Sequence, residues 1–165
     1  FRSFKNRLLL DGFGYYMHQL QKGRDLWIGG IKIDYHLGLK GHSDADVLIH
    51  AICDALLGAA NLRDIGFHFP DTSDEYENID SSILLRKTIK LLKDKGYSVN
   101  NIDSTICAEK PKLNPFIPAM QQRLSEVMGI DTDLISIKAT TSEKMGFVGR
   151  EEGITAYAVV LIEKG

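Results

Sequence analysis

The sequence is poor in cysteine and has no long apolar run, and both shortages exclude classes of protein. The 165 residues include two cysteines, Cys53 and Cys107, in apolar contexts without CxxC spacing. This argues against a disulfide framework or a thiolate zinc site and favours a reducing compartment. No apolar run approaches the ~20 residues that a membrane-spanning helix needs. Residues 1–7 are not followed by the hydrophobic region of a signal peptide.

An excess of charge of one sign is also missing. The chain has 20 basic and 22 acidic residues, for a net charge of -2, so no global field attracts DNA, RNA or an anionic membrane. Any phosphate binding must therefore be local. A hydrophobic content of 44% in a chain of this length is typical of one globular domain with a real core. We expect a single domain over residues 1–165, with an atypical N-terminal segment at 1–11.

Apolar periodicity predicts an alternation of strands and helices. The expected elements are a first strand ending near His18, a strand pair or bulged strand at 26–33, a helix at 44–62, a helix at 81–95, a strand at 97–108, a helix at 118–128, and strands at 134–140 and 154–162. This order predicts an α+β fold with helices packed on one face of a sheet.

Residues 41–50 place two imidazoles, two carboxylates and a hydroxyl where a loop meets an apolar helix. If the helix begins near Ser43 or Asp44, either side chain can cap it. Asp46 and His50 lie one turn apart, so the carboxylate can hold a ring nitrogen and fix its tautomer, as carboxylates do behind metal-bound histidines. His50 is thus a candidate metal ligand with Asp46 behind it. The alternative is a helix N-terminus with a surface histidine and ordinary capping acids.

The loop at 64–72 follows this helix. Gly66 and Pro70 predict an irregular backbone, and Asp64 and Asp71 supply acceptors for sugar hydroxyls or a metal-bound water. Taken by itself, the loop favours an Asx-type turn between two helices over a binding role. Residues 111–115 precede the next helix, where backbone N–H groups can meet a phosphate.

Three consecutive hydroxyls followed by an acid and a lysine, residues 140–144, come directly after a strand. Hydroxyls can bind phosphate oxygens, and the Glu143 carboxylate can hold magnesium. The alternative is a capping box in which Thr140 or Thr141 caps a short helix. Residues 146–153 are by default a solvated turn.

These motifs occur in one order: HSDAD at 42–46, DIG at 64–66 with FPD at 69–71, PKL at 111–113, and KATTSEKMGF at 138–147. From about Gly12 to the C-terminus the chain resembles the 2-C-methyl-D-erythritol 2,4-cyclodiphosphate synthase family of the non-mevalonate isoprenoid pathway. The resemblance implies a homotrimeric lyase with active sites between subunits. Its reaction converts 4-diphosphocytidyl-2-C-methyl-D-erythritol 2-phosphate to the cyclic diphosphate and CMP.

The resemblance also implies zinc and magnesium (or manganese) as cofactors, a cytidine diphosphate-linked substrate, and no nucleic acid polymer or membrane as partner. A cavity on the trimer axis would hold an isoprenoid diphosphate or another anion. The absence of a clear transit peptide favours the bacterial cytoplasm over a plastid.

Site residues carry over from the family position by position. The resemblance makes His42 and Thr141 catalytic, His18 and His50 zinc ligands, and Glu143 a magnesium ligand. The implied substrate-binding residues are Ser43, Asp46, Asp64, Ile65, Gly66, Phe69, Pro70, Asp71, Thr72, Ser73, Ala108, Glu109, Lys110, Pro111, Lys112, Leu113, Asn114, Thr140, Ser142, Phe147 and Arg150. Asp46 would orient the site, and Phe147 and Arg150 would face the trimer axis.

The chain departs from the family at the first strand, where the family has Asp-x-His and this chain has Tyr16 before His18. A phenol with a pKa near 10 is a poor zinc ligand at neutral pH. Asp11 cannot replace the carboxylate, because its odd offset from His18 places it on the opposite strand face. Ser142 and Met145, where the family more often has Thr and Leu, are milder changes.

Three hypotheses follow from Tyr16. The chain is an active synthase that tolerates or bypasses the tyrosine, or it is a metal-deficient, catalytically weakened trimer that binds cytidine nucleotides. A purely structural oligomer would require the phosphate and metal motifs to be coincidental.

Overall fold

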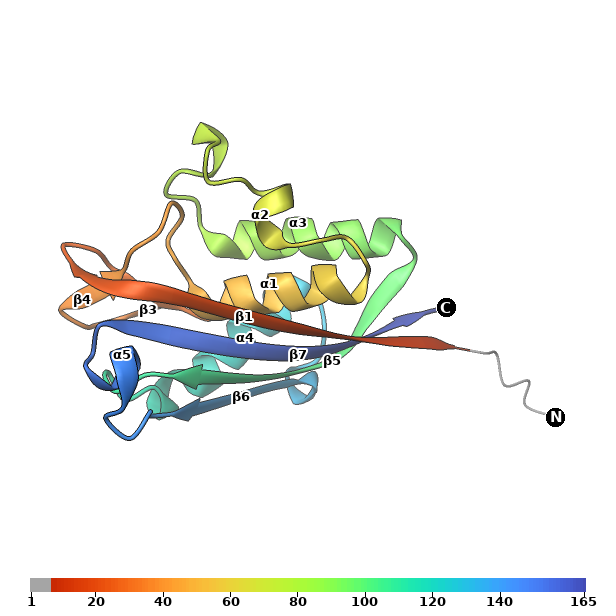
Figure 1. Cartoon of the computed structure of the whole chain (residues 1–165). Coiled ribbons are helices and arrows are strands. Elements are labelled where there is room, and N and C mark those ends of the chain that lie inside the picture. Colours follow the sequence, from red (N-terminus) through yellow and green to blue (C-terminus); the bar gives the residue numbers. More distant parts are fainter. Residues whose placement is uncertain (1–6) are drawn as a thin grey trace.

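The computed structural model describes residues 7–165 and contains a five-stranded sheet covered on one face by helices (Figure 1). Residues 1–6, part of the segment expected to be atypical, lie outside the described residues. The strands are β1 (Leu8–Lys22), β2 (Leu26–Ile28), β3 (Ile31–Ile33), β4 (Leu37–Leu39), β5 (Tyr97–Cys107), β6 (Ile135–Thr140) and β7 (Gly153–Lys164). The helices are α1 (Val47–Ala59), α2 (Ile65–His68), α3 (Ser81–Asp94), α4 (Ile117–Met128) and α5 (Gly146–Gly149), with 3-10 turns at Asp74–Tyr76, Asn114–Phe116 and Thr132–Leu134. The predicted α+β class is confirmed.

The strand order is β4-β1-β7-β5-β6, with β2 and β3 in a separate hairpin. β7 is antiparallel to both of its neighbours, and β5 and β6 are parallel. Met17 pairs with Thr155, Thr155 with Cys107, and Cys107 with Thr140, so these four residues form one row across the sheet. The C-terminal half of β1 and the ends of β5 and β6 therefore lie toward the same end of the sheet.

The prediction that the first strand ends near His18 is wrong, because β1 continues to Lys22. The last residues of β1 are mostly polar and exposed, but Leu20 to Lys22 pair with β4. A strand of three residues such as β4 has no periodicity that the sequence could reveal. The other predicted strands and the three long helices are present, with ends shifted by a few residues.

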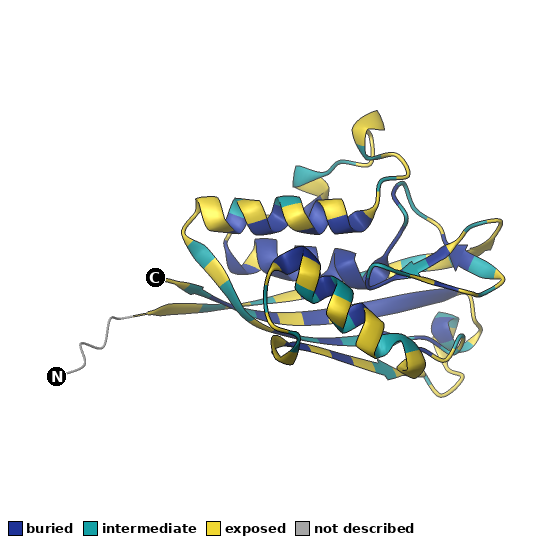
Figure 2. Cartoon of the chain, turned by 180° about the vertical axis from the view of Figure 1, so that it is seen from behind, coloured by how far each residue is buried: buried dark blue, intermediate teal, exposed yellow. Residues whose placement is uncertain are grey.

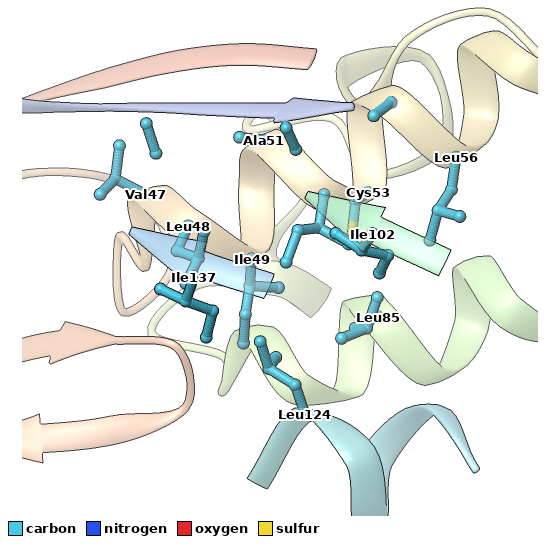
Figure 3. Close-up of a cluster of buried hydrophobic side chains, with 14 of the residues drawn as sticks. Val47, Leu48, Ile49, Ala51, Cys53, Leu56, Leu85, Ile102, Leu124 and Ile137 are labelled. Carbon is cyan, nitrogen blue, oxygen red and sulfur yellow. The ribbon is translucent and has the colours of Figure 1, made fainter. Parts of the chain in front are cut away.

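Helix α1 forms the centre of the core (Figure 3). It packs against β1 and β7 on one side and α3 on the other, and 11 of its residues are buried. Figure 2 shows that α3 and α4 instead alternate buried and exposed residues, as surface helices do. Cys53 is one of the buried residues, and neither cysteine forms a disulfide.

Two glycines allow α1 to approach the sheet closely. A Cβ placed on Gly12 would lie 2.1 Å from the backbone oxygen of Ala55, and one on Gly14 would lie 1.9 Å from that of Ala51. These distances are far below van der Waals contact, so both positions require the absence of a side chain.

The opposite face of the sheet carries exposed apolar side chains, namely Phe13, Tyr15, Met17, Tyr157 and Val159. The Tyr15 and Tyr157 rings stack with centroids 4.9 Å apart. Asp11 lies on this face too, as predicted from its odd offset to His18. Within residues 7–165 no helix is both long and apolar enough to cross a membrane.

Candidate active site

A cleft of about 420 Å³ opens between β1, the loop that precedes α1, and the segment from α2 to the 3-10 turn Asp74–Tyr76. We call it the histidine cleft. It is lined by Tyr16, His18, Gly41, His42, Ser43, His50, Ile65, Gly66, Phe69, Pro70, Asp71, Thr72, Tyr76 and Leu84. Most of these were predicted site residues, and Gly41, Tyr76 and Leu84 were not.

Two histidines meet at the floor of the cleft. His18 projects from the helix-facing side of β1 and His50 from the first turn of α1, and His18 Nε2 lies 2.9 Å from His50 Nδ1. Burial lowers the pKa of His18 to about 4, and burial together with the neighbouring His18 lowers the pKa of His50 to about 3. Both imidazoles are therefore neutral at pH 7, the form in which histidine binds metals.

Tyr16 lies beside this pair. Its ring centroid is 5.5 Å from that of His18 and 5.1 Å from that of His50. Burial, followed by the negative charges of Asp54 and Asp64, raises the pKa of the Tyr16 phenol above 10.0. The phenol is protonated at neutral pH. Across residues 7–165 no three His, Cys, Asp or Glu side chains come together as a group that could hold a metal ion.

The other ring nitrogen of His50 contacts two serines. Nε2 lies 3.0 Å from Ser81 Oγ and 3.2 Å from Ser43 Oγ. Ser81 Oγ donates in turn to Asp44 Oδ1, at 2.5 Å. Ser81 was missed by sequence analysis, because a serine at the first position of a helix is read as an ordinary helix start.

The interpretation of Asp46 as the carboxylate behind His50 is wrong. Asp46 is fully buried, and its oxygens accept from the backbone N–H groups of Gly29 (2.9 Å), Gly30 (2.7 Å) and Ile49 (3.0 Å). Asp46 is the N-cap of α1, so its side chain turns back toward the free N–H groups of its own helix. The expected caps, Ser43 and Asp44, lie before it.

Burial raises the pKa of Asp46 to about 7, and the charge of Asp44 adds to the shift, while the three N–H donors oppose it. Gly29 and Gly30, both with positive φ, form the turn of the β2–β3 hairpin. Asp46 therefore joins this hairpin to α1 and does not line the histidine cleft.

Of the residues predicted to contact substrate here, His42 lines the cleft and Asp64 does not. His42 Nε2 lies 2.9 Å from the backbone oxygen of Ser73. Asp64 does not line the cleft, because it caps α2 and accepts from Phe67 N at 3.2 Å. The loop predicted to be irregular thus contains the short helix α2, with Asp64 as its cap. This arrangement is closer to the Asx-type turn than to an irregular binding loop.

The remaining predicted residues form a second region, which we call the edge loops: residues 108–114 after β5 and 140–144 after β6. Glu109 joins them, because Oε1 accepts from Ser142 N (3.0 Å), Ser142 Oγ (3.1 Å) and Lys144 N (3.1 Å). Those N–H donors lower the pKa of Glu109. Ala108 N also donates to Thr140 O at 2.9 Å.

The hydroxyls of the edge loops do not cap a helix. Thr141 Oγ1 contacts Glu143 Oε1 at 3.1 Å, and the N-cap of α5 is Met145, which makes no side-chain capping bond. The capping-box alternative is therefore wrong. Residues 146–153 contain the four-residue helix α5 in place of the expected turn. No residue of the edge loops lines the histidine cleft.

Phe147 and Arg150 differ in their surroundings. Phe147 lines a smaller cavity of about 260 Å³ together with Met17, His18, Gln19, Glu152 and Gly153. Arg150 does not line it and instead pairs with Glu152, with Nε 2.8 Å from Oε1.

The protein is thus an α+β domain with two neutral imidazoles in a cleft between the sheet and its helices. The family model described as YgbB family matches residues 10–163. The chain belongs to this family.

Relatives agree with this assignment. The 2-C-methyl-D-erythritol 2,4-cyclodiphosphate synthase of Bacteroides fragilis is 69% identical over 153 residues, which are 93% of this chain and 96% of that protein. The bifunctional IspDF from Campylobacter jejuni superposes with a TM-score of 0.93 at 38% identity, over 97% of this chain and 43% of that one. The Plasmodium falciparum IspF–CDP complex gives a TM-score of 0.83 at 32% identity, over 95% and 97% of the two chains. The chain is an enzyme of this synthase family.

Proposed function

We propose that this protein converts 4-diphosphocytidyl-2-C-methyl-D-erythritol 2-phosphate to 2-C-methyl-D-erythritol 2,4-cyclodiphosphate and CMP, as a lyase of non-mevalonate isoprenoid biosynthesis. An oxygen of the 2-phosphate attacks the β-phosphorus of the diphosphate. The bond from that phosphorus to the bridging oxygen breaks, and CMP leaves with the electron pair. Such a reaction requires alignment and neutralisation of phosphate charge more than a protein base.

The meeting of His18 and His50 in the histidine cleft is the observation that carries this proposal. Two neutral imidazole nitrogens 2.9 Å apart are donors for one cation. Two nitrogens bound to one tetrahedral zinc ion at about 2.0 Å each are about 3.3 Å apart. The observed separation is close to this value, so the pair fits zinc.

Tyr16 does not fit as the third zinc ligand, because its phenol stays protonated at neutral pH. A substrate phosphate oxygen or a water would complete the coordination. Glu143, exposed on the edge loops, would hold magnesium or manganese. When bound, the two ions supply Lewis-acid polarisation and charge neutralisation at the phosphates.

The chain's own residues position the substrate. Ser43, Asp71 and Thr72 line the cleft and present oxygens toward the methylerythritol phosphate, with His42 stabilising the transition state. On the edge loops, Thr141 stabilises the diphosphate during displacement. The backbone of residues 108–114 holds the cytidine, a role in keeping with the CDP named in the solved Plasmodium complex.

We also propose a homotrimer with the site shared between subunits. The edge loops do not line the histidine cleft of their own chain, and in the proposed trimer the edge loops of a second copy complete each cleft. The apolar sheet face that carries Phe13, Tyr15, Met17, Tyr157 and Val159 is the surface that the subunits would bury. The small cavity beside Phe147 would then face the trimer axis, with Arg150 nearby to attract an isoprenoid diphosphate or another anion. Bacterial relatives support a cytoplasmic location.

The reaction is tested by following CMP release and formation of the cyclic diphosphate by ³¹P NMR with zinc and magnesium present. Tyr16→Asp serves as the matched comparison, and zinc per subunit is measured in both proteins. Turnover by the parent protein supports the proposal. CDP binding without turnover in the parent, with turnover restored by Tyr16→Asp, would overturn it in favour of the metal-deficient binding trimer.

Sharing of the site is tested by mixing subunits. His50→Gln and Glu143→Gln damage opposite halves of the site, so each homotrimer should be nearly inactive. Refolding the two variants together should recover part of the activity, because some interfaces then combine two intact halves. Recovery no greater than the sum of the separate activities would contradict a shared site.

A further inference from the structure

Four polar side chains form a chain of contacts that includes His18 and His50. Asp44 lies in the loop before α1, Ser81 begins α3, and His50 lies in α1, with His18 of β1 at the far end. The links are Asp44 Oδ1 to Ser81 Oγ at 2.5 Å, Ser81 Oγ to His50 Nε2 at 3.0 Å, and His50 Nδ1 to His18 Nε2 at 2.9 Å. Ser81 is fully buried, so no solvent competes for its hydroxyl.

The direction of hydrogen bonding in this chain is set at Asp44. Its two oxygens already accept from the backbone N–H groups of Asp46 (3.1 Å) and Ser81 (2.9 Å). Ser81 Oγ donates to Asp44 Oδ1, so the single hydroxyl proton of Ser81 points to Asp44. The Ser81 oxygen then has only lone pairs to offer to His50.

That arrangement decides which nitrogen of His50 carries the proton. A neutral imidazole has one N–H and one lone pair. If Nε2 carried the lone pair, it would face a lone pair of Ser81 Oγ at 3.0 Å. With the proton on Nε2, the same contact is a hydrogen bond. The lone pair of Nδ1 then points at His18 Nε2, which carries the proton of their 2.9 Å contact in the metal-free protein and gives it up when both nitrogens bind a metal.

Ser43 does not decide the tautomer. Its Oγ lies 3.2 Å from His50 Nε2 and also accepts from Ala45 N at 3.2 Å. The Ser43 hydroxyl keeps its own proton free to turn, so it can donate to Nε2 or accept from it. Ser81 lacks that freedom.

We propose that Asp44 and Ser81 are positioning residues that hold His50 as the Nε2–H tautomer, with Nδ1 as its metal-binding atom. The inference rests on the proposed zinc role of His50. The sequence predicted that Asp46, at the start of the same helix, orients His50. Ser81 and Asp44, which lie outside that helix, take this role instead. Groups that hold metal-bound histidines in this way are worth about 10–100-fold in metal affinity.

The test compares Ser81→Ala with Ser82→Ala. Ser82 is the next residue of α3 and is also fully buried, but its hydroxyl bonds Asp80 Oδ1 at 2.6 Å and does not contact His50. Both variants and the parent are labelled with ¹⁵N-histidine and freed of metal, and ¹H–¹⁵N correlation spectra report the tautomer of each ring. The sequence has five histidines, and His50→Gln identifies the His50 signals.

In the parent we expect the His50 proton on Nε2. In Ser81→Ala we expect a mixture of tautomers, because Ser43 can then donate to Nε2, whereas Ser82→Ala should match the parent. Zinc affinity, measured by competition with a chelator, should fall about tenfold or more for Ser81→Ala and less than about twofold for Ser82→Ala. Ser81→Thr keeps the hydroxyl and should restore the parent tautomer.

Two results would overturn the proposal: a parent His50 with its proton on Nδ1, or the same tautomer in Ser81→Ala as in Ser82→Ala. If Ser81→Ala does not fold, the spectra of the parent and of Ser81→Thr still show whether the His50 proton lies on Nε2 when position 81 carries a hydroxyl. A third result separates the two proposals: the parent shows the Nε2–H tautomer, Ser81→Ala loses it, and the parent binds no zinc. That result would support the positioning role and contradict the zinc site of the proposed function.

Discussion

The histidine cleft and the edge loops carry the two halves of the proposed site, and they are built differently. In the cleft, His50, Ser81 and Ser43 are buried and held by hydrogen bonds from separate segments. In the edge loops, Thr141 and Glu143 are exposed, and Glu143 has a positive φ of 54°. Packing in the core holds the two imidazoles in place, whereas Thr141 and Glu143 of the edge loops are exposed to solvent.

This contrast has a physical cause. Metal-binding nitrogens must be aimed to within a fraction of an ångström, and a packed core supplies that rigidity. Groups that bind a charged, flexible nucleotide must first be open to solvent for it to enter. Mutations in the two regions should therefore separate stability from activity.

The largest effect is expected at Asp46, the N-cap of α1. Asp46→Ala leaves three N–H groups without their acceptor, two of them in buried hydrogen bonds and one in a part-buried one, and we expect a loss of about 3 kcal/mol or more in the free energy of unfolding. Asp64→Ala, which removes the exposed cap of α2, should cost about 1 kcal/mol. Urea unfolding measures both. Equal losses would mean that Asp46 is an ordinary helix cap.

Removing a cleft imidazole should abolish chemistry. His50→Gln deletes one of the two zinc donors, and we expect CMP release to fall at least about 100-fold, together with zinc content. A variant with full zinc and at least a tenth of the parent rate would show that His18 alone suffices. His68→Gln is the control, because His68 lies outside the cleft and bonds the backbone of Leu62.

The edge loops should show the reverse pattern. Thr141→Val removes an exposed hydroxyl, and we expect CMP release to fall about tenfold while the free energy of unfolding changes by less than about 0.5 kcal/mol. Thr132→Val, in the 3-10 turn before β6 and outside both the edge loops and the histidine cleft, should change neither quantity. A loss of stability in Thr141→Val would indicate that the edge loops support the fold.

The smallest effect is expected from acidification of the edge loops. Donors from Lys144 and Ser142 lower the pKa of Glu109 below 4.5, so the ionised form is favoured in the folded state. The resulting stabilisation is complete above the ordinary pKa of glutamate and is lost as pH falls through the lower folded value. Amide hydrogen exchange at Ser142 and Lys144 should therefore show less protection at acidic pH, and Glu109→Gln should show little pH dependence. Equal pH dependence in both proteins would contradict this role.

The fold was largely predictable from the sequence, because long helices and strands have clear apolar periods. The predicted helix at 81–95 and strand at 97–108 match α3 and β5 within a residue or two. The short elements β4, α2 and α5 were not predicted, since three or four residues carry no period. His18 and His50, 32 positions apart, were paired through the family resemblance, and the structure brings them to 2.9 Å.

The polar connections within the cleft could not be predicted. Asp46 and His50 have the spacing of neighbours on one helix face, but an N-cap side chain belongs to the start of the helix and turns away from that face. Ser81 reaches His50 from another helix, and only tertiary packing brings the two together. Whether Tyr16 permits zinc binding depends on coordination by substrate, which neither spacing nor fold determines.

Gly12 and Gly14 have a consequence for the evolution of this enzyme. They set the spacing between α1 and β1, and hence the separation of the two imidazoles that project from those elements. Even one methyl group at Gly14 would collide with the backbone of α1 and push this helix away from β1. The two rings would then move apart, although the methyl group contacts neither of them. Gly12 and Gly14 should therefore be among the residues least free to vary in this family, although they take no part in the reaction. Substitutions elsewhere in α1 should be tolerated only if they preserve its close contact with β1.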